Sequence, residues 1–186
     1  MTSRSTLTAL SSAQLGALDA LLPRHKDFPR EGIVFVDVLP LFASPPLRTA
    51  VFDALAAAVR ALPVRVDAVA GLEARGFLFL ALAERLGVPF VCLRKAGKLP
   101  GATARVDYAL EYGTASLELA GGALAPGARV LLVDDVLATG GTARAGEALL
   151  ARAGARAVAV AVVAEVAACG GAATLGAPHV LAVLRV

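Results

Sequence analysis

Short apolar runs that alternate with helix-like segments are the feature of this 186-residue sequence that most restricts its fold. Segments with helical periodicity, RGFLFLALAERLG from Arg75 to Gly87 and residues 142–153, separate several of these runs. Strands that are apolar on both faces and separated by helices are typical of a parallel sheet with helices on both sides. The chain is long enough for one such domain and too short for two, so we expect a single α/β domain over residues 1–186. The apolar runs cover residues 66–71, 88–93, 128–133, 157–163 and 179–186.

The chain before residue 66 follows another pattern. Ser11 opens a capping box, SSAQ, which predicts a short helix to about Leu22. Residues 23–30 form a polar connection and residues 33–42 an extended, mostly apolar segment. Ser44 and Pro45 are typical of a helix start, and that helix would have an apolar inner face. Further along, residues 94–112 are a polar excursion, and β-like pieces at 106–110 and 115–119 predict a hairpin.

Composition and charge exclude several classes of protein. Hydrophobic residues make up 58% of the chain and charged residues 18%, which is typical of a globular protein. The net charge is +3, but no cationic run concentrates it, so we expect no nucleic-acid partner. The longest uncharged window, Val166–Leu184, contains glycines and a proline, and the N-terminus lacks the apolar core of a signal peptide. We therefore expect no membrane contact and a cytoplasmic location, with Cys92 and Cys169 reduced and no metal site at either.

The segment VLLVDDVLATGGT, from Val130 to Thr142, indicates a ligand site. It runs from a strand through two carboxylates to a glycine pair that precedes a helix, and ligands of open α/β sheets bind at such strand ends. The glycines allow a tight turn, and the amides of the following helix start would hold a phosphate. No P-loop and no GxGxxG motif competes with this site, and the alternative is an ordinary strand–turn–helix connection.

This segment closely resembles the phosphoribosyl pyrophosphate motif of the type I phosphoribosyltransferases. The resemblance implies that Asp134 and Asp135 face the ribose hydroxyl groups, while the loop holds the ribose 5-phosphate. The acids and the phosphate therefore need not touch. The loop residues implied are Ala138, Thr139, Gly140, Gly141 and Thr142.

Further stretches, in the same order along the chain, resemble the adenine phosphoribosyltransferases. The resemblance spans about Phe28 to Glu165 and implies a type I fold with a small N-terminal hood, about residues 1–42, and a flexible β-hairpin loop, about residues 94–115. It implies that adenine and phosphoribosyl pyrophosphate react to give AMP and pyrophosphate, with Mg²⁺ as cofactor, in a homodimer. The stretches are FPREGIVFVDV (residues 28–38), GLEARGF (71–77), RKAGKLPG (94–101) and LEYG (110–113).

The resemblance also implies roles for individual residues. Glu73, Ala74 and Arg75 would form a pyrophosphate loop, with Arg75 among the catalytic residues. Glu111 would be the acid/base near the purine imidazole edge, with Tyr112 beside it. Arg94, Lys95 and Lys98 would supply cations from a mobile segment. From the residues alone, the cations could equally form a solvated basic loop and Glu111 a solvated carboxylate.

For the base, the resemblance places Phe35 on one face of the purine and Val136 on the other. Backbone groups around Val34 and Val36 would read its Watson–Crick edge. The alternative is that Phe35 belongs to the core. Mg²⁺ would be held mainly by substrate oxygens and water, with Asp134 and Asp135 as the candidate protein ligands.

The sequence departs from the family at a few positions. Val36 stands where several members have Arg, Ala96 replaces a residue that is often basic, and Glu73 stands where Asp is common. Nothing functional is carried over beyond Glu165, and His25 and His179 have no partners at useful spacing. Two other functions stay open: transfer to another purine or pyrimidine base, and a regulator of this fold that binds nucleic acid.

Overall fold

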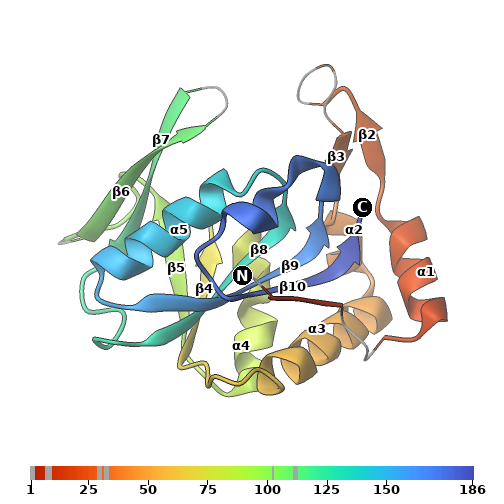
Figure 1. Ribbon diagram of the computed structural model, residues 1–186, viewed down its shortest axis with the longest axis horizontal. Helices are drawn as coiled ribbons and strands as arrows, with labels where there is room; N and C mark the ends of the chain where they lie inside the picture. Colours follow the sequence, from red (N-terminus) through yellow and green to blue (C-terminus); the bar gives the residue numbers. More distant parts are fainter. Residues whose placement is uncertain (1–2, 7–9, 29–30, 32–33, 102, 111–112) are drawn as a thin grey trace.

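A large mixed sheet forms the centre of the molecule in the computed structural model, which describes residues 3–6, 10–28, 31, 34–101, 103–110 and 113–186. Its strand order is β1-β10-β9-β8-β4-β5-β7-β6 (Figure 1). Neighbours from β1 to β5 pair in parallel, and β7 pairs antiparallel with both β5 and β6. The strands are β1 (Ser3–Thr6), β4 (Ala68–Leu72), β5 (Phe90–Lys95), β6 (Thr103–Leu110), β7 (Gly113–Ala120), β8 (Arg129–Leu137), β9 (Arg156–Glu165) and β10 (His179–Arg185).

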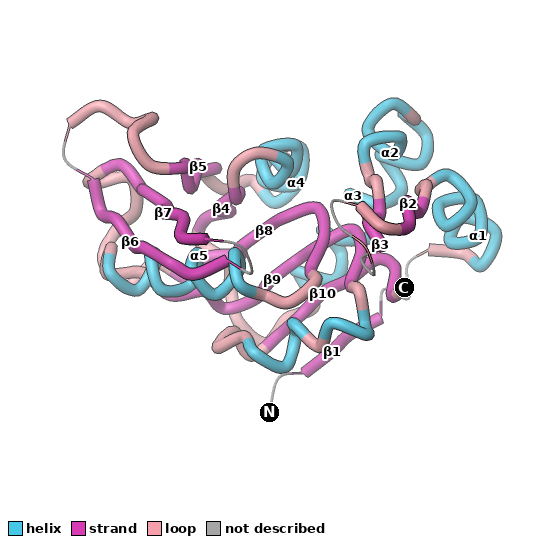
Figure 2. The backbone as a smooth tube through the Cα atoms, turned by 90° about the horizontal axis from the view of Figure 1, so that it is seen from above, coloured by secondary structure: helices cyan, strands magenta, loops and turns pink. Residues whose placement is uncertain are grey.

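Helices cover both faces of this sheet, as the apolar strands predicted. Figure 2 shows α5 (Gly141–Arg152) on one side and α4 (Leu80–Leu86) on the other. Two buried clusters correspond to these faces. One contains Phe52 and Leu55 of α3 (Pro45–Arg60), and the other contains Leu149 and Leu150 of α5. The predicted α/β class is therefore confirmed.

A smaller unit lies at one end of the sheet and consists of α1 (Ser12–Leu21), β2 (Arg24–Lys26), β3 (Val34–Val36) and α2 (Leu39–Ala43) (Figure 1). The predicted capping box is present, because Ser11 and Gln14 exchange side-chain and backbone hydrogen bonds. β2 and β3 form a separate two-stranded antiparallel sheet. The β6–β7 hairpin projects at the opposite end of the molecule from this unit.

Several local predictions were wrong. Residues 33–42 were expected to be extended throughout, but α2 begins at Leu39, with Pro40 in its first turn, where a missing N–H costs nothing. The helix expected from Arg75 starts as a 3₁₀ segment, η1 (Arg75–Phe79), before α4. β1 and β2 were not expected at all. Within the described residues, no helix is both long enough and apolar enough to cross a membrane.

Candidate active site

The predicted phosphate loop, residues 138–142 and called the phosphate loop below, joins the carboxyl end of β8 to the start of α5. Gly140 has φ +81°, which L side chains rarely adopt, so glycine suits this turn. The first amides of a helix have no carbonyl partner within it, and no side-chain hydrogen bond caps α5. No acidic residue lies in the first turn either. These amides and the positive end of the helix dipole are therefore available to an anion.

The two carboxylates of β8 have different surroundings. The side chain of Asp135 is buried, and its Oδ2 lies 2.9 Å from Nε of Arg75, an ion pair without hydrogen-bond alignment. Oδ1 of Asp134 accepts the Asp135 backbone N–H at 2.9 Å. Burial, followed by the negative charge of Asp135, raises the pKa of Asp134 well above its ordinary value. Asp134 therefore holds a proton more readily than a surface aspartate, which suits it to hydrogen bonding with hydroxyl groups.

Glu73, just after β4, binds basic residues at the end of β5 and in the loop that follows it. Its carboxylate accepts from Nε of Arg94 at 2.9 Å, from the Lys95 backbone N–H at 2.8 Å and from Nζ of Lys98 at 2.9 Å. Burial acts to raise the pKa of Glu73, but these three donors outweigh it and lower the pKa to about 2. Arg94 and Lys98 thus both form ion pairs with the carboxylate of Glu73, although their side chains stay partly exposed to solvent.

Arg75 connects the strand ends to the smaller unit. Besides its ion pair with Asp135, its guanidinium carbon lies 5.2 Å from the centre of the Phe35 ring. One side chain therefore contacts both the carboxyl end of β8 and the aromatic residue on β3. Glu73 and Ala74, joined by a cis peptide bond, immediately precede it. The structure thus brings the predicted pyrophosphate loop, the predicted ribose acids and the predicted base-stacking residue together.

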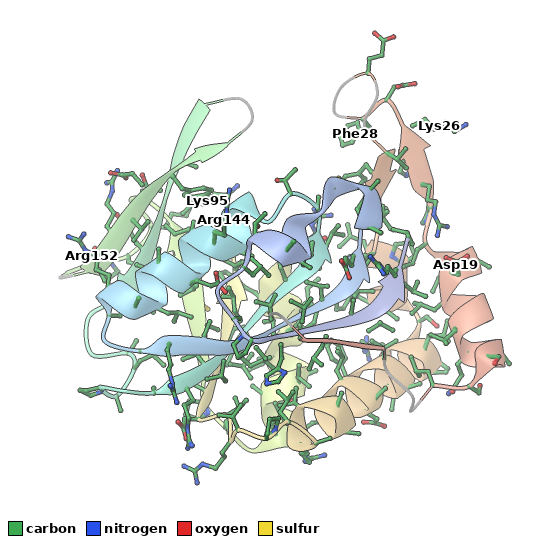
Figure 3. The ribbon with its side chains drawn as sticks, in the orientation of Figure 1. Asp19, Lys26, Phe28, Lys95, Arg144 and Arg152 are labelled. Atoms are coloured by element: carbon green, nitrogen blue, oxygen red, sulfur yellow. The ribbon has the colours of Figure 1, made fainter. Side chains whose placement is uncertain are left out.

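Phe35 does not belong to either buried cluster and keeps part of its ring exposed. Phe28 packs edge-on against it with ring centres 5.2 Å apart, and His25 lies 6.5 Å away. Phe28 is 54% exposed, and Figure 3 shows it beside the β2–β3 pair, across from Lys95 at the end of β5. Sequence reasoning assigned no site role to Phe28 or His25, because their proximity to Phe35 depends on the β2–β3 pairing.

The backbone groups of Val34 and Val36 face the open edge of the small sheet. The Asp37 N–H donates to the Pro23 carbonyl at 2.9 Å, and the register places Val36 opposite Arg24. Because hydrogen-bonded and non-hydrogen-bonded pairs alternate along an antiparallel ladder, the N–H and C=O groups of Val34 and Val36 point away from β2. Val36 as a whole residue is 2% exposed, so its side chain packs in the core and its backbone groups are shielded from solvent as well. Val136, on β8, is partly buried and packs against the buried cluster that contains Phe52 and Leu55.

The β6–β7 hairpin reaches the phosphate loop through Tyr108. Burial raises the pKa of Tyr108, a hydrogen bond with Thr142 opposes this shift, and the charge of Asp134 adds to it. Tyr108 is therefore close to both Thr142 of the predicted phosphate loop and Asp134, one of the predicted ribose acids, a placement that the sequence did not signal. Glu111 and Tyr112, the predicted acid/base and its neighbour, lie outside the described residues.

The carboxylates of Asp134 and Asp135 are the metal-binding candidates at this strand end. Within the described part of the chain, no cluster of three or more His, Cys, Asp or Glu side chains could hold a metal ion. Mg²⁺ keeps several waters and binds one or two carboxylates together with substrate phosphates. This pair of acids beside the phosphate loop fits that mode and does not fit a site built by protein ligands alone.

Comparison with known proteins identifies close relatives. Residues 41–173 match the phosphoribosyl transferase domain family. An adenine phosphoribosyltransferase of Kineococcus radiotolerans is 55% identical over 157 residues, 84% of either chain. Another from Nocardioides sp. is 49% identical over 185 residues, covering 97% of this chain and all of that one.

A solved structure extends the similarity to the backbone. The adenine phosphoribosyltransferase of Saccharomyces cerevisiae, complexed with an imino-altritol bisphosphate and adenine, superposes with a TM-score of 0.85 at 40% identity. The match covers 91% of this chain and 98% of the yeast chain. Sequence and backbone thus agree on the same group of relatives.

Proposed function

Because the chain belongs to the adenine phosphoribosyltransferase family, we propose that it transfers the phosphoribosyl group of phosphoribosyl pyrophosphate to adenine, giving AMP and pyrophosphate. One observation carries this proposal beyond the family match. The Arg75 guanidinium contacts both Asp135 at the end of β8 and the ring of Phe35, so a donor site and an aromatic base site adjoin.

The donor would bind at the carboxyl end of β8. The amides of residues 138–142 and the hydroxyls of Thr139 and Thr142 would hold the 5-phosphate. Asp134 and Asp135 would meet the ribose hydroxyls. The raised pKa of Asp134 supports this assignment, because a carboxyl group that protonates readily can donate as well as accept a hydrogen bond.

Displacement at the anomeric carbon passes through an oxocarbenium-like state, and the leaving pyrophosphate gains negative charge. Arg75, with the backbone of Glu73 and Ala74, would stabilise that charge. Arg94, Lys95 and Lys98 lie on the adjoining loop and would add to the field. Mg²⁺ bound by substrate oxygens, water and the β8 acids would neutralise part of the pyrophosphate charge.

The base would stack on Phe35, with Val136 toward its other face. Backbone groups of Val34 and Val36 at the open edge of β3 would read the exocyclic amine and the neighbouring ring nitrogen. The departure at Val36 is compatible with adenine, because the valine side chain is buried and the exchange leaves the backbone N–H and C=O groups of this residue unchanged. Glu111, with Tyr112, would exchange a proton at the imidazole edge of the purine.

The decisive experiment compares bases. Purified protein, phosphoribosyl pyrophosphate and Mg²⁺ are incubated with adenine, hypoxanthine, xanthine, guanine or uracil, and nucleotide formation is followed. We expect AMP from adenine and little product from the others, with chelation of Mg²⁺ abolishing turnover. Robust use of another base without adenine turnover would refute the proposal, and salt-sensitive binding of duplex DNA would favour the regulator instead.

We also propose that the protein acts in the cytoplasm as a homodimer. Leu78 and Leu80, at the junction of η1 and α4, are 40% and 50% exposed, and in this proposal a second subunit covers them. Light scattering across a range of concentrations tests this: a monomer at assay concentration would contradict it.

A further inference from the structure

The segment that follows β9 packs directly against the phosphate loop. This segment, residues 170–177, contains η3 (Gly171–Thr174) and is called the strut below. The Gly171 N–H donates to the Ala138 carbonyl at 3.0 Å. The Thr174 hydroxyl donates to the Gly171 carbonyl at 2.7 Å and lies 3.5 Å from the carbonyl oxygen of Thr139.

The contact is so close that it excludes a side chain at Gly171. A Cβ atom there would lie 2.1 Å from the Ala138 carbonyl oxygen and 2.7 Å from the Gly140 nitrogen. The approach is reciprocal, because a Cβ on Gly140 would lie 2.6 Å from Oγ1 of Thr174 and 2.9 Å from the Gly171 carbonyl oxygen. Real Cβ contacts below 3.0 Å are essentially never seen, so two stretches of backbone set each other's position.

The other end of the strut is fixed to α5, the helix that the phosphate loop opens. The Glu147 carboxylate accepts the Gly176 N–H at 3.0 Å and the Ala177 N–H at 2.7 Å. Between the two attachments, the strut buries Ala172 completely and Leu175 almost completely. It therefore bridges the loop and the helix that would together hold the phosphate, and it is anchored in the core.

We propose that Gly171 is a positioning residue for the sugar donor: its close packing on Ala138 and Gly140 fixes the phosphate loop in its binding conformation. This rests on the proposed function, in which that loop holds the 5-phosphate. Gly171 itself touches no substrate. Its effect is transmitted through the position of the loop backbone, and misplacing binding groups by about 1 Å can cost on the order of a hundredfold in activity.

The test is Gly171→Ala, with Gly176→Ala as the matched control. A Cβ on Gly176 would find its nearest neighbour, Oε2 of Glu147, at 3.6 Å, an ordinary contact in the same strut. Ribose 5-phosphate binding is measured by calorimetry, KM is measured for each substrate, and Tm by thermal unfolding. For Gly171→Ala we expect ribose 5-phosphate affinity and the KM for phosphoribosyl pyrophosphate to worsen about tenfold or more, with the adenine KM near wild type.

A further variant separates positioning from loss of stability. Ala172→Gly loosens the strut without adding an atom against the loop, since Ala172 is buried among core residues. If it lowers Tm as much as Gly171→Ala and weakens ribose 5-phosphate binding equally, the effect is general loosening and the proposal is overturned. Should Gly171→Ala fail to fold, Thr174→Val takes its place. Loss of the hydroxyl contacts should then weaken ribose 5-phosphate binding severalfold, and unchanged binding would overturn the proposal.

Measurements on the wild-type protein separate a failure of this proposal from a failure of the proposed function. Wild-type binding of ribose 5-phosphate without AMP formation would refute the proposed reaction, while the comparison of strut variants still decides the role of Gly171. Unaltered ribose 5-phosphate affinity in folded Gly171→Ala would overturn the positioning role alone. No binding of ribose 5-phosphate by wild type would overturn the positioning role, because the loop would then not hold the 5-phosphate, while AMP formation still decides the proposed reaction.

Discussion

Replacing Glu73 by glutamine should make the enzyme more sensitive to inhibition by pyrophosphate. In the structure, Arg94 and Lys98 both bind the Glu73 carboxylate, so Glu73 competes with any anionic ligand for these two cations. Glutamine is nearly isosteric and still accepts hydrogen bonds, but it carries no charge. Both cations then become available to the leaving group, and the repulsion between Glu73 and pyrophosphate disappears.

The exposure of the partners sets the size of the effect. The Lys98 side chain is 50% exposed, and an ion pair of that kind contributes about 0.2–1 kcal/mol. The Arg94 side chain is 30% exposed, so its bond to Glu73 contributes about 1 kcal/mol, below the range for fully buried charged hydrogen bonds. Together the two pairs amount to about 1–2 kcal/mol, which corresponds to roughly 5- to 30-fold tighter inhibition by pyrophosphate.

The assay is product inhibition of AMP formation, titrating pyrophosphate at fixed Mg²⁺. Glu118→Gln is the matched control, because the Glu118 carboxylate accepts the Gly97 N–H of the same loop at 3.0 Å and forms its ion pair with Arg105, although the Glu118 backbone lies opposite Arg94 in the β5–β7 pair. Chemical unfolding adds an independent readout. Glu73 has its pKa lowered to about 2 from 4.5, so its stabilisation is present above pH 4.5 and is lost as the pH falls toward 2, and the variant should lack this loss. Unchanged or weaker pyrophosphate inhibition in Glu73→Gln, or an equal change in Glu118→Gln, would refute the reasoning.

Three further predictions concern the base, the ribose acids and the acid/base. Phe35→Ala should raise the adenine KM by about 5- to 100-fold through lost stacking, with little change in Tm because the ring lies outside the core, whereas an unchanged adenine KM would return Phe35 to a structural role. Asp134→Asn should impair use of phosphoribosyl pyrophosphate yet raise the free energy of unfolding at pH 8. Because the pKa of Asp134 is raised in the folded state, the wild-type protein loses free energy of unfolding as the pH rises through that pKa. Near pH 3 the free energies of unfolding of variant and wild type should therefore be equal. A variant less stable than wild type at pH 8 would contradict this. Glu111→Gln should lower kcat with little change in ribose 5-phosphate affinity, and a wild-type rate would mark Glu111 as a solvated carboxylate.

The central sheet was predictable because its signal is local. β4, β5, β8 and β9 are apolar on both faces, and few other structures accommodate such runs between helices. β1 and β2 carry the sequences SRST and RHK, which have no strand pattern of their own. They pair with β10 and β3 respectively, so tertiary contact overrides weak local preference.

In the candidate site, too, the sequence predicted residues that are neighbours in the chain but not contacts made by the fold. The phosphate loop, Asp134 and Asp135 are contiguous in sequence, so their motif predicted them together. The strut lies about thirty residues further on, and its relation to the loop depends on β9 returning the chain to the same sheet edge. Likewise, Glu73 was predicted as part of the pyrophosphate loop, but its capture of Arg94 and Lys98 requires the parallel pairing of β4 with β5.

The open edge of β3 has a consequence for how such an enzyme can diverge. The groups that Val34 and Val36 present there are N–H and C=O groups, which every residue except proline supplies in full. In the proposed function, side chains at these positions can change without altering the backbone groups that would read the base, and the buried Val36 fits this expectation. A new base preference would instead require a shift in the pairing of β3 with β2, because a slip of one residue turns the other set of amides and carbonyls outward. Base specificity that depends on backbone groups should therefore change rarely, and only when the β2–β3 register shifts by a whole residue.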